Sequence, residues 1–193
     1  HVAGFGKVVM TAPHHPSGTD RCHEALEIIK KHRPIEANDV VVNIQGDEPF
    51  IQAEQIQALT RCLTDHPHIC IATLVRPLDH PHEAMDENMV KCVFDKEKKA
   101  MYFSRLPIPG IKTGGKQHKP HYQHLGLYAF RAATLEQLVA LPQGKLEMTE
   151  SLEQLRWMEN GFDVHVEITH TKSTSVDTPE DLKKLISRSF FLI

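Results

Sequence analysis

Runs of apolar residues alternate along the chain with segments of helical periodicity, and this alternation predicts an α/β fold. Nearly continuous β-branched runs, such as the one from 39 to 45, are typical of strands that are covered on both faces of a parallel sheet. The predicted elements are strands at 7–10, 39–45 and 68–75, helices at 20–32 and 53–64, a hairpin from 89 to 103, a strand at 124–130, helices at 134–141 and 149–160, a strand at 164–168 and a helix beginning at 178.

The length of 193 residues fits one domain, and we expect residues 1–193 to form it. The region 85–130 combines the predicted hairpin with a loop rich in Pro, Gly and Lys, so it is expected to be an antiparallel extension of the sheet. Lys and Arg number 22 against 25 Asp and Glu, without a basic stripe, which argues against a nucleic-acid partner.

The chain has no apolar run of about 18 residues and no charged-then-apolar leader, so we expect neither a membrane span nor a signal peptide. Its four cysteines are far apart in the sequence, which predicts free thiols in a reducing cytoplasm rather than a disulfide framework. The 14 histidines are scattered, and we expect most of them to be surface residues rather than metal ligands.

The loop that follows the strand at 39–45 carries two carboxylates, Asp47 and Glu48, beside a glycine. Ligands of open α/β sheets gather where strands end, and Mg²⁺ prefers carboxylate oxygens together with substrate phosphates. Asp47 is therefore a candidate magnesium ligand. The alternative is a polar turn in which both acids face water.

A second candidate acid, Asp177, precedes the last predicted helix, where it or Thr178 alternatively caps the free amide groups of the first turn. Two remote acids that meet at one site would form a metal clamp for a triphosphate. Asp47 and Asp177 together are thus the predicted metal ligands.

The segment 15–21 connects a predicted strand to a predicted helix and offers amides and hydroxyls near a helix N-terminus. Ser17, Gly18, Thr19 and Arg21 are candidates for binding the nucleotide there, although helix capping by Ser17 or Thr19 is the competing explanation.

Several residues suit an acidic substrate that is rich in hydroxyls. An arginine can hold a carboxylate through two parallel hydrogen bonds, and Glu and Gln side chains can bind sugar hydroxyls. Taken singly, each is more often an ordinary surface or capping residue. The candidates are Arg105, His124, Tyr128, Glu153 and Gln154.

Six motifs in order resemble one family, the 3-deoxy-manno-octulosonate cytidylyltransferases. Any one of them is compatible with chance, whereas six in the same order are not. They are H-P-S-G-T-D-R (15–21), V-V-N-I-Q-G-D-E-P (41–49), Y-F-S-R (102–105), H-L-G-L-Y (124–128), L-E-Q-L-R (152–156) and V-D-T-P-E-D-L (176–182).

This resemblance implies a Rossmann-like nucleotidyltransferase fold, with a mostly parallel sheet and a small antiparallel extension. It implies transfer of CMP from CTP to 3-deoxy-D-manno-octulosonate (Kdo), with release of pyrophosphate, for lipopolysaccharide biosynthesis. Asp47 and Asp177 would bind Mg²⁺, Gln45 would lie beside the reacting groups, and Ser17, Gly18, Thr19 and Arg21 would lie near the cytidine. Kdo would be surrounded by Arg105, His124, Tyr128, Glu153 and Gln154. A homodimer with contacts in the region 85–130 is also implied.

Members of the family usually begin with a segment of the form I-P-A-R-x-x-S-x-R-x-P-x-K, which cradles the triphosphate. We expect such a segment upstream of His1 in a longer molecule, and without it the chain should bind CTP poorly. The alternatives are a CMP-sialic acid synthetase and a catalytically silent nucleotide-binding module. A histidine-rich metal-binding protein has little support beyond composition.

Overall fold

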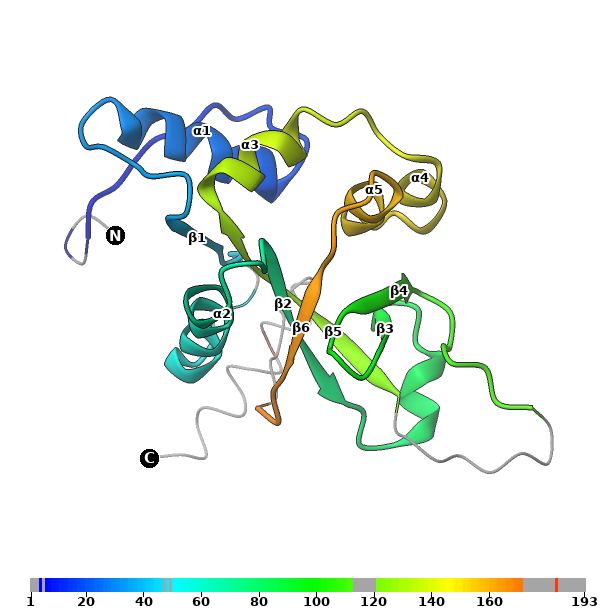
Figure 1. Ribbon diagram of the computed structural model, residues 1–193. Helices are drawn as coiled ribbons and strands as arrows, with labels where there is room; N and C mark the ends of the chain where they lie inside the picture. The colour runs from blue at the N-terminus through cyan, green and yellow to red at the C-terminus, as the bar shows by residue number, and fades with distance from the viewer. Residues whose placement is uncertain are drawn as a thin grey trace.

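The computed structural model describes residues 4, 6–46, 48, 50–112, 121–171 and 183. Within this part, one sheet runs through the molecule in the order β4-β3-β5-β2-β6, with β1 paired to β5 as a branch (Figure 1). The strands are β1 (Val40–Asn43), β2 (Ile71–Pro77), β3 (Lys91–Phe94), β4 (Ala100–Ser104), β5 (Tyr122–Arg131) and β6 (His165–Ile168).

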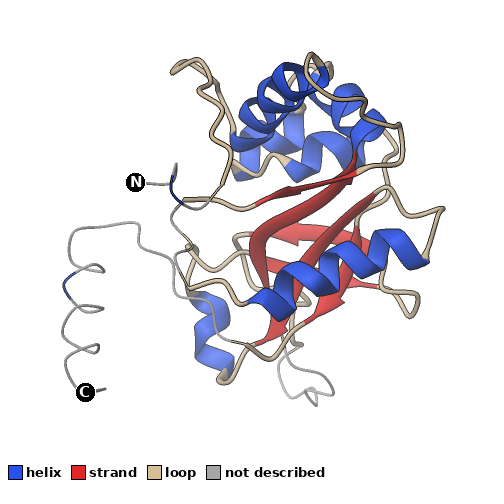
Figure 2. Ribbon diagram, turned by 90° about the vertical axis from the view of Figure 1, so that its left-hand side faces the viewer, coloured by secondary structure: helices blue, strands red, loops and turns tan. Residues whose placement is uncertain are grey.

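Helices cover both faces of this sheet, as Figure 2 shows. On one face, Leu26, Leu135 and Trp157, from three different helices, pack in one core with Phe130 of β5. On the other face, within the described residues, α2 contributes Leu59 to a second core. The helices are α1 (Gly18–Lys30), α2 (Ala53–Asp65), α3 (Ala132–Val139), α4 (Lys145–Glu150) and α5 (Gln154–Glu159), with a 3₁₀ helix at Pro81–Met85.

The long helices begin where the sequence supplies capping groups. Ser17 precedes α1, and its hydroxyl accepts a hydrogen bond from the Asp20 amide. The side chain of Gln55 accepts a hydrogen bond from the Gln52 amide at the start of α2. None of the described helices is long and apolar enough to cross a membrane.

The α/β class and the antiparallel extension are confirmed, but the expectation of a mostly parallel sheet is not exact. Among the described strands, only β2 and β6 pair in parallel. The strand predicted at 39–45 forms as β1, yet it runs antiparallel to β5, with Val41 opposite Phe130. A continuous apolar run reports that both faces of a strand are covered, and it does not encode the direction of the neighbouring strand.

The prediction of a strand at 7–10 was wrong, because these residues have no regular structure and pair with none of the described strands. Val8 and Met10 are 51% and 85% exposed. A short apolar run becomes a strand only where a neighbour accepts its backbone hydrogen bonds.

The helix predicted at 149–160 is two short helices, α4 and α5, that meet at a break. Ser151 ends α4 in the left-handed region at φ 54°, and Glu153 precedes α5. The apolar spacing is continuous across this break, so periodicity alone could not find it. The break turns Ser151 and Glu153 toward the site described next.

Candidate active site

A pocket of about 460 Å³ lies against β5 and the break between α4 and α5. Six residues that were predicted from the sequence line it, although they come from four separate segments of the chain. They are Gln45, Arg105, His124, Tyr128, Glu153 and Gln154. The structure therefore brings the predicted sugar-binding residues and Gln45 together, while the role of each one stays a prediction.

Arg105 is held over the pocket by main-chain carbonyls. Its Nε donates to the carbonyl of Glu150 at 2.7 Å, and its two terminal nitrogens donate to the carbonyls of Glu87 at 3.1 Å and Ser151 at 3.3 Å. A guanidinium has five N–H donors, so these three bonds orient it and leave two N–H groups for a ligand. The three acceptors are uncharged, so the positive charge is available to an anionic substrate.

Two buried polar atoms at the pocket have no hydrogen-bond partner among the described residues: the hydroxyl of Tyr128 and the side-chain nitrogen of Gln154. The nearby Thr73 hydroxyl contacts the Leu127 carbonyl at 2.7 Å and the His124 ring at 2.9 Å instead. Buried polar groups are rarely left unpaired, and a ligand with hydroxyls would satisfy both.

His124 is half-buried in the lining of the pocket, and its Nε2 lies 2.9 Å from the Thr73 hydroxyl. Burial lowers the pKa of His124 from 6.5 to about 3, so its imidazole is neutral at physiological pH. It contacts the rings of Phe103 and Tyr128 at centroid distances of 4.9 and 5.3 Å. A neutral, packed imidazole serves to position groups and to donate or accept one hydrogen bond, rather than to attract an anion.

The lowered pKa of His124 predicts a loss of stability in acid. Between pH 6.5 and about 3 the unfolded chain binds a proton at this residue that the folded chain does not bind, so the free energy of unfolding falls as the pH falls. The expected contribution is about 1.4 kcal/mol per pH unit. Urea unfolding of the wild type and of His124→Gln at several pH values in this window should show a shallower decline for the variant. If the free energy of unfolding fell with pH equally steeply in both proteins, the lowered pKa of His124 would be contradicted.

Glu153 connects the pocket to the N-terminus of α1. Its two carboxylate oxygens accept hydrogen bonds from the Ser17 hydroxyl at 3.1 Å and the Thr19 hydroxyl at 2.9 Å. Burial raises the pKa of Glu153, while these two hydroxyls oppose that shift. Ser17 also caps α1, so the capping role and the site role predicted for this segment occur together.

The close approach of α1 to β1 explains the glycine of this segment. A Cβ atom on Gly18 would lie 3.3 Å from the side-chain nitrogen of Asn43, at the end of β1. Arg21, in contrast, donates from an exposed position to the Thr11 hydroxyl at 2.9 Å and the Ala12 carbonyl at 3.0 Å. Ser17 and Thr19 thus adjoin the pocket through Glu153, whereas Arg21 is not among the residues that line it.

The two predicted magnesium ligands, Asp47 and Asp177, lie outside the described residues. Gln45 and Glu48 from the same loop line the pocket. Their oxygen atoms, and those of Glu153, are of the kind that Mg²⁺ binds in proteins.

The profile of the family described as Cytidylyltransferase matches residues 1–175 of this chain. The chain belongs to the cytidylyltransferase family. Two similar relatives are the 3-deoxy-manno-octulosonate cytidylyltransferases of Parabacteroides distasonis, 47% identical over 94% of this chain and 73% of the relative, and of Bacteroides thetaiotaomicron, 49% identical over 92% and 72%.

A solved structure described as CMP:2-keto-3-deoxy-manno-octonic acid synthetase complexed with CTP is similar to this cytidylyltransferase with a TM-score of 0.86. It is 33% identical in sequence, and the match covers 99% of this chain and 75% of that one. The resemblance that was inferred from the six motifs is therefore confirmed at the level of the family and the fold.

Two pocket residues of this cytidylyltransferase, Asn88 and Gln123, were missed by the sequence analysis. Gln123 is fixed by Arg76, whose Nε donates to its side-chain oxygen at 2.8 Å. The position of Gln123 was an available signal, because it directly precedes the H-L-G-L-Y motif on the same strand. Asn88 comes from a segment without periodicity, and nothing in the sequence marks it.

The backbone of Arg105 is held by Lys91, a residue that was also not predicted from the sequence. Lys91 is completely buried, and its ammonium group donates to the carbonyls of Asp86, at 2.8 Å, and of Arg105. Glu150 accepts a hydrogen bond from the Arg105 amide at 2.9 Å. These contacts fix the strand end that carries the guanidinium of Arg105.

Proposed function

We propose that this protein transfers CMP from CTP to Kdo, giving CMP-Kdo and pyrophosphate. The relatives named above carry that activity in their names, and one similar structure was solved with CTP. The observation that carries the proposal for this chain is the pocket itself. An oriented arginine, an unpaired tyrosine hydroxyl and an unpaired amide nitrogen converge there, which suits a carboxylate flanked by hydroxyls.

In the proposed reaction the anomeric hydroxyl of the sugar attacks the α-phosphorus of CTP, and the bond from that phosphorus to pyrophosphate breaks. The chain's own residues would contribute mainly by positioning the reactants. Arg105 would orient the sugar carboxylate, while Tyr128 and Gln154 would bind hydroxyls. Glu153, already bonded to Ser17 and Thr19, would fix the sugar pocket relative to the nucleotide segment.

We also propose that Mg²⁺ serves the reaction, held by Asp47 and Asp177. The pocket suits the ion because Glu48 and Glu153 add carboxylate oxygens to its lining. When bound, Mg²⁺ would neutralise charge on the triphosphate. Asp47→Asn and Asp177→Asn are each expected to raise the Mg²⁺ concentration needed for half-maximal pyrophosphate release. An unchanged requirement would remove that residue from the metal site.

Pyrophosphate release decides among the candidate functions. With CTP and Mg²⁺, the protein is expected to turn over Kdo and not sialic acid. A preference for sialic acid would assign the second sugar, and an absence of release with either sugar, together with retained CTP binding, would support a silent nucleotide-binding module.

Removing the Tyr128 hydroxyl should separate substrate binding from stability. In Tyr128→Phe the KM for Kdo is expected to rise about 3- to 10-fold, in line with ~1 kcal/mol for one hydrogen bond. The free energy of unfolding should stay the same or increase, because the hydroxyl has no partner among the described residues. Tyr122→Phe is the control, since Tyr122 lies on the same strand and does not line the pocket. Equal KM values for all three proteins would contradict this role.

We propose further that the protein forms a homodimer through the region 85–130. Four large apolar side chains in this region are well exposed: Met85, Met101, Leu106 and Ile111. Met101 lies on β4, which is the edge strand of the described sheet. Exposed apolar groups on an edge strand favour association. Light scattering in solution should give twice the mass of one chain, and a monomer at micromolar concentration would contradict the proposal.

We propose a cytoplasmic location because the cysteines are free thiols. Cys22, Cys62, Cys70 and Cys92 are all free, and free thiols persist in reducing compartments. Fractionation of the source cells would test this, with recovery in the membrane or periplasmic fraction as the contradicting result.

A further inference from the structure

A second group of chemically reactive side chains lies on the opposite face of the sheet from the Thr73 and His124 side chains. Strand β6 runs parallel to β2, with His165 opposite Ala72 and Glu167 opposite Leu74. Ala72 and Leu74 belong to the core beneath α2. Because side chains alternate between the faces of a strand, His165 and Glu167 point toward α2, away from the sugar pocket.

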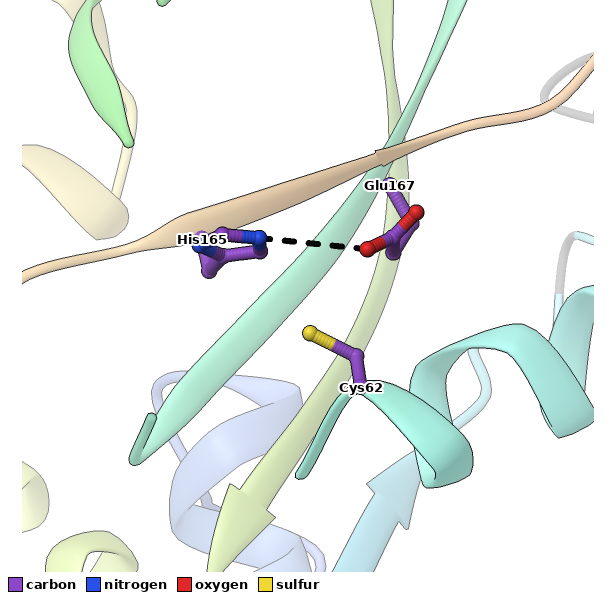
Figure 3. Close-up of side chains that lie close together, drawn as sticks. All are labelled: Cys62, His165 and Glu167. Carbon is purple, nitrogen blue, oxygen red and sulfur yellow. Dashed lines mark ion pairs between the residues drawn. The ribbon is translucent and has the colours of Figure 1, made fainter. Parts of the chain in front are cut away.

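Helix α2 presents Cys62 to these two residues, and Figure 3 shows the three side chains directed toward one another. One ligand atom from each, a sulfur, an imidazole nitrogen and a carboxylate oxygen, lie within 4.8 Å of one another. His165 Nε2 and Glu167 Oε1 are 3.8 Å apart. Cys62 is buried, whereas His165 and Glu167 are half-buried.

We propose that Cys62, His165 and Glu167 form a binding site for a zinc ion, with water as the fourth ligand. Thiolate, imidazole and carboxylate are the three ligand types that Zn²⁺ accepts in tetrahedral sites. Hard cations such as Mg²⁺ avoid sulfur, so the ligand set selects a softer ion than the one proposed for the nucleotide site. His165 also borders a surface pocket of about 360 Å³, from which water can reach the fourth position.

The distances allow the site to close by side-chain movement. In a tetrahedral zinc site with bonds of about 2.0–2.3 Å, neighbouring ligand atoms are about 3.3–3.6 Å apart. The 3.8 Å separation between His165 and Glu167 therefore needs to shorten by about half an ångström. The separations from the Cys62 sulfur are at most 4.8 Å, so they need to shorten by at most about 1.2 Å. We expect rotation of the three side chains between rotamers to supply these movements.

Charge compensation also fits a divalent ion. A thiolate and a carboxylate neutralise Zn²⁺, and the thiol proton passes to solvent as the metal–sulfur bond forms. Burial, followed by the Glu167 charge, raises the pKa of Cys62 to about 12 in the metal-free protein, so the thiol stays protonated until the ion displaces its proton. Lys98 binds the other oxygen of Glu167 at 2.8 Å and leaves Oε1 facing His165.

Bound zinc would connect α2 to the edge strand β6. β6 pairs with β2 along its length, and on its other side it is joined only to residues 98–100, by an isolated bridge between Lys99 and His165. A metal bound by the folded chain alone stabilises it by mass action, so zinc should raise the melting temperature.

Cobalt(II) titration of the chelator-treated, full-length chain, with Mg²⁺ in excess, tests the proposal. One equivalent should produce the charge-transfer absorption of a thiolate–cobalt bond together with the visible bands of tetrahedral cobalt, and Zn²⁺ should abolish both. Cobalt in the nucleotide site would give no thiolate band. Cys62→Ala should lose this band, and Cys70→Ala, which removes a neighbouring thiol of the same chain, should keep it.

Cys62 is buried, so Cys62→Ala could lose the band through misfolding, and two further variants control for this. His165→Gln and Glu167→Gln change half-buried side chains and should each weaken cobalt binding at least tenfold while the protein stays folded by circular dichroism. The absence of a thiolate band in the wild type would overturn the proposal. So would a band that survives Cys62→Ala, or cobalt affinities of both glutamine variants equal to that of the wild type.

Discussion

Replacement of Arg105 by glutamine is expected to lower kcat/KM for Kdo about 100- to 1,000-fold. The expected loss corresponds to two charge-assisted hydrogen bonds to the sugar carboxylate, together about 3–4 kcal/mol. The loss should appear in the dependence of the rate on Kdo concentration, and the KM for CTP should change little. Initial rates of pyrophosphate release at varied Kdo and fixed CTP measure it.

Arg105→Lys distinguishes the fork geometry of the guanidinium from its charge. Lysine keeps the positive charge but cannot bind a carboxylate through two parallel bonds, so an intermediate loss is expected. The matched control is Arg61→Gln, because Arg61 is exposed on α2, on the other side of the sheet. A rate for Arg105→Gln equal to that of this control would remove Arg105 from substrate recognition. Urea unfolding of each variant would separate a binding effect from loss of the three bonds to main-chain carbonyls.

Arg156→Met is expected to destabilise the fold by about 3–5 kcal/mol, because it leaves a buried carboxylate without its partner. Arg156 and Glu147 are each 7% exposed, and two parallel bonds of 2.8 and 2.5 Å join them. This pair ties α4 to α5 and so fixes the break that carries Glu153. The free energy of unfolding in urea is the measurement.

A double-mutant cycle makes this prediction specific. Glu147→Gln combined with Arg156→Met should cost less than the sum of the two single changes, because no buried charge is then left unpaired. Lys99→Met is the control, since it breaks an ion pair with Asp163 of similar length, 2.6 Å, in which the two side chains are 51% and 67% exposed. Exposed pairs contribute little. Strict additivity, or equal losses for the Arg156 and Lys99 variants, would contradict the role of burial.

Most helices and strands were predictable because their cause is local. The capping hydroxyl of Ser17, the apolar stripe of α2 and the β-branched residues of β1 each specify their own segment. Segments whose structure depends on a distant neighbour were not predictable. Residues 7–10 have the composition of a strand and remain unpaired, and the break at Ser151 interrupts a continuous helical pattern.

By itself, the sequence determined the family, the α/β class and six of the residues that line the pocket, because side-chain chemistry and short motifs can be read within single segments. Only the tertiary structure decided the direction of strand pairing, the break that turns Glu153 toward Ser17 and Thr19, and the three carbonyls that orient Arg105. It alone also brought Cys62 to His165 and Glu167, about a hundred residues later in the chain. These features depend on contacts between segments far apart in the chain, and the pattern within one segment does not specify the partner that folding places beside it.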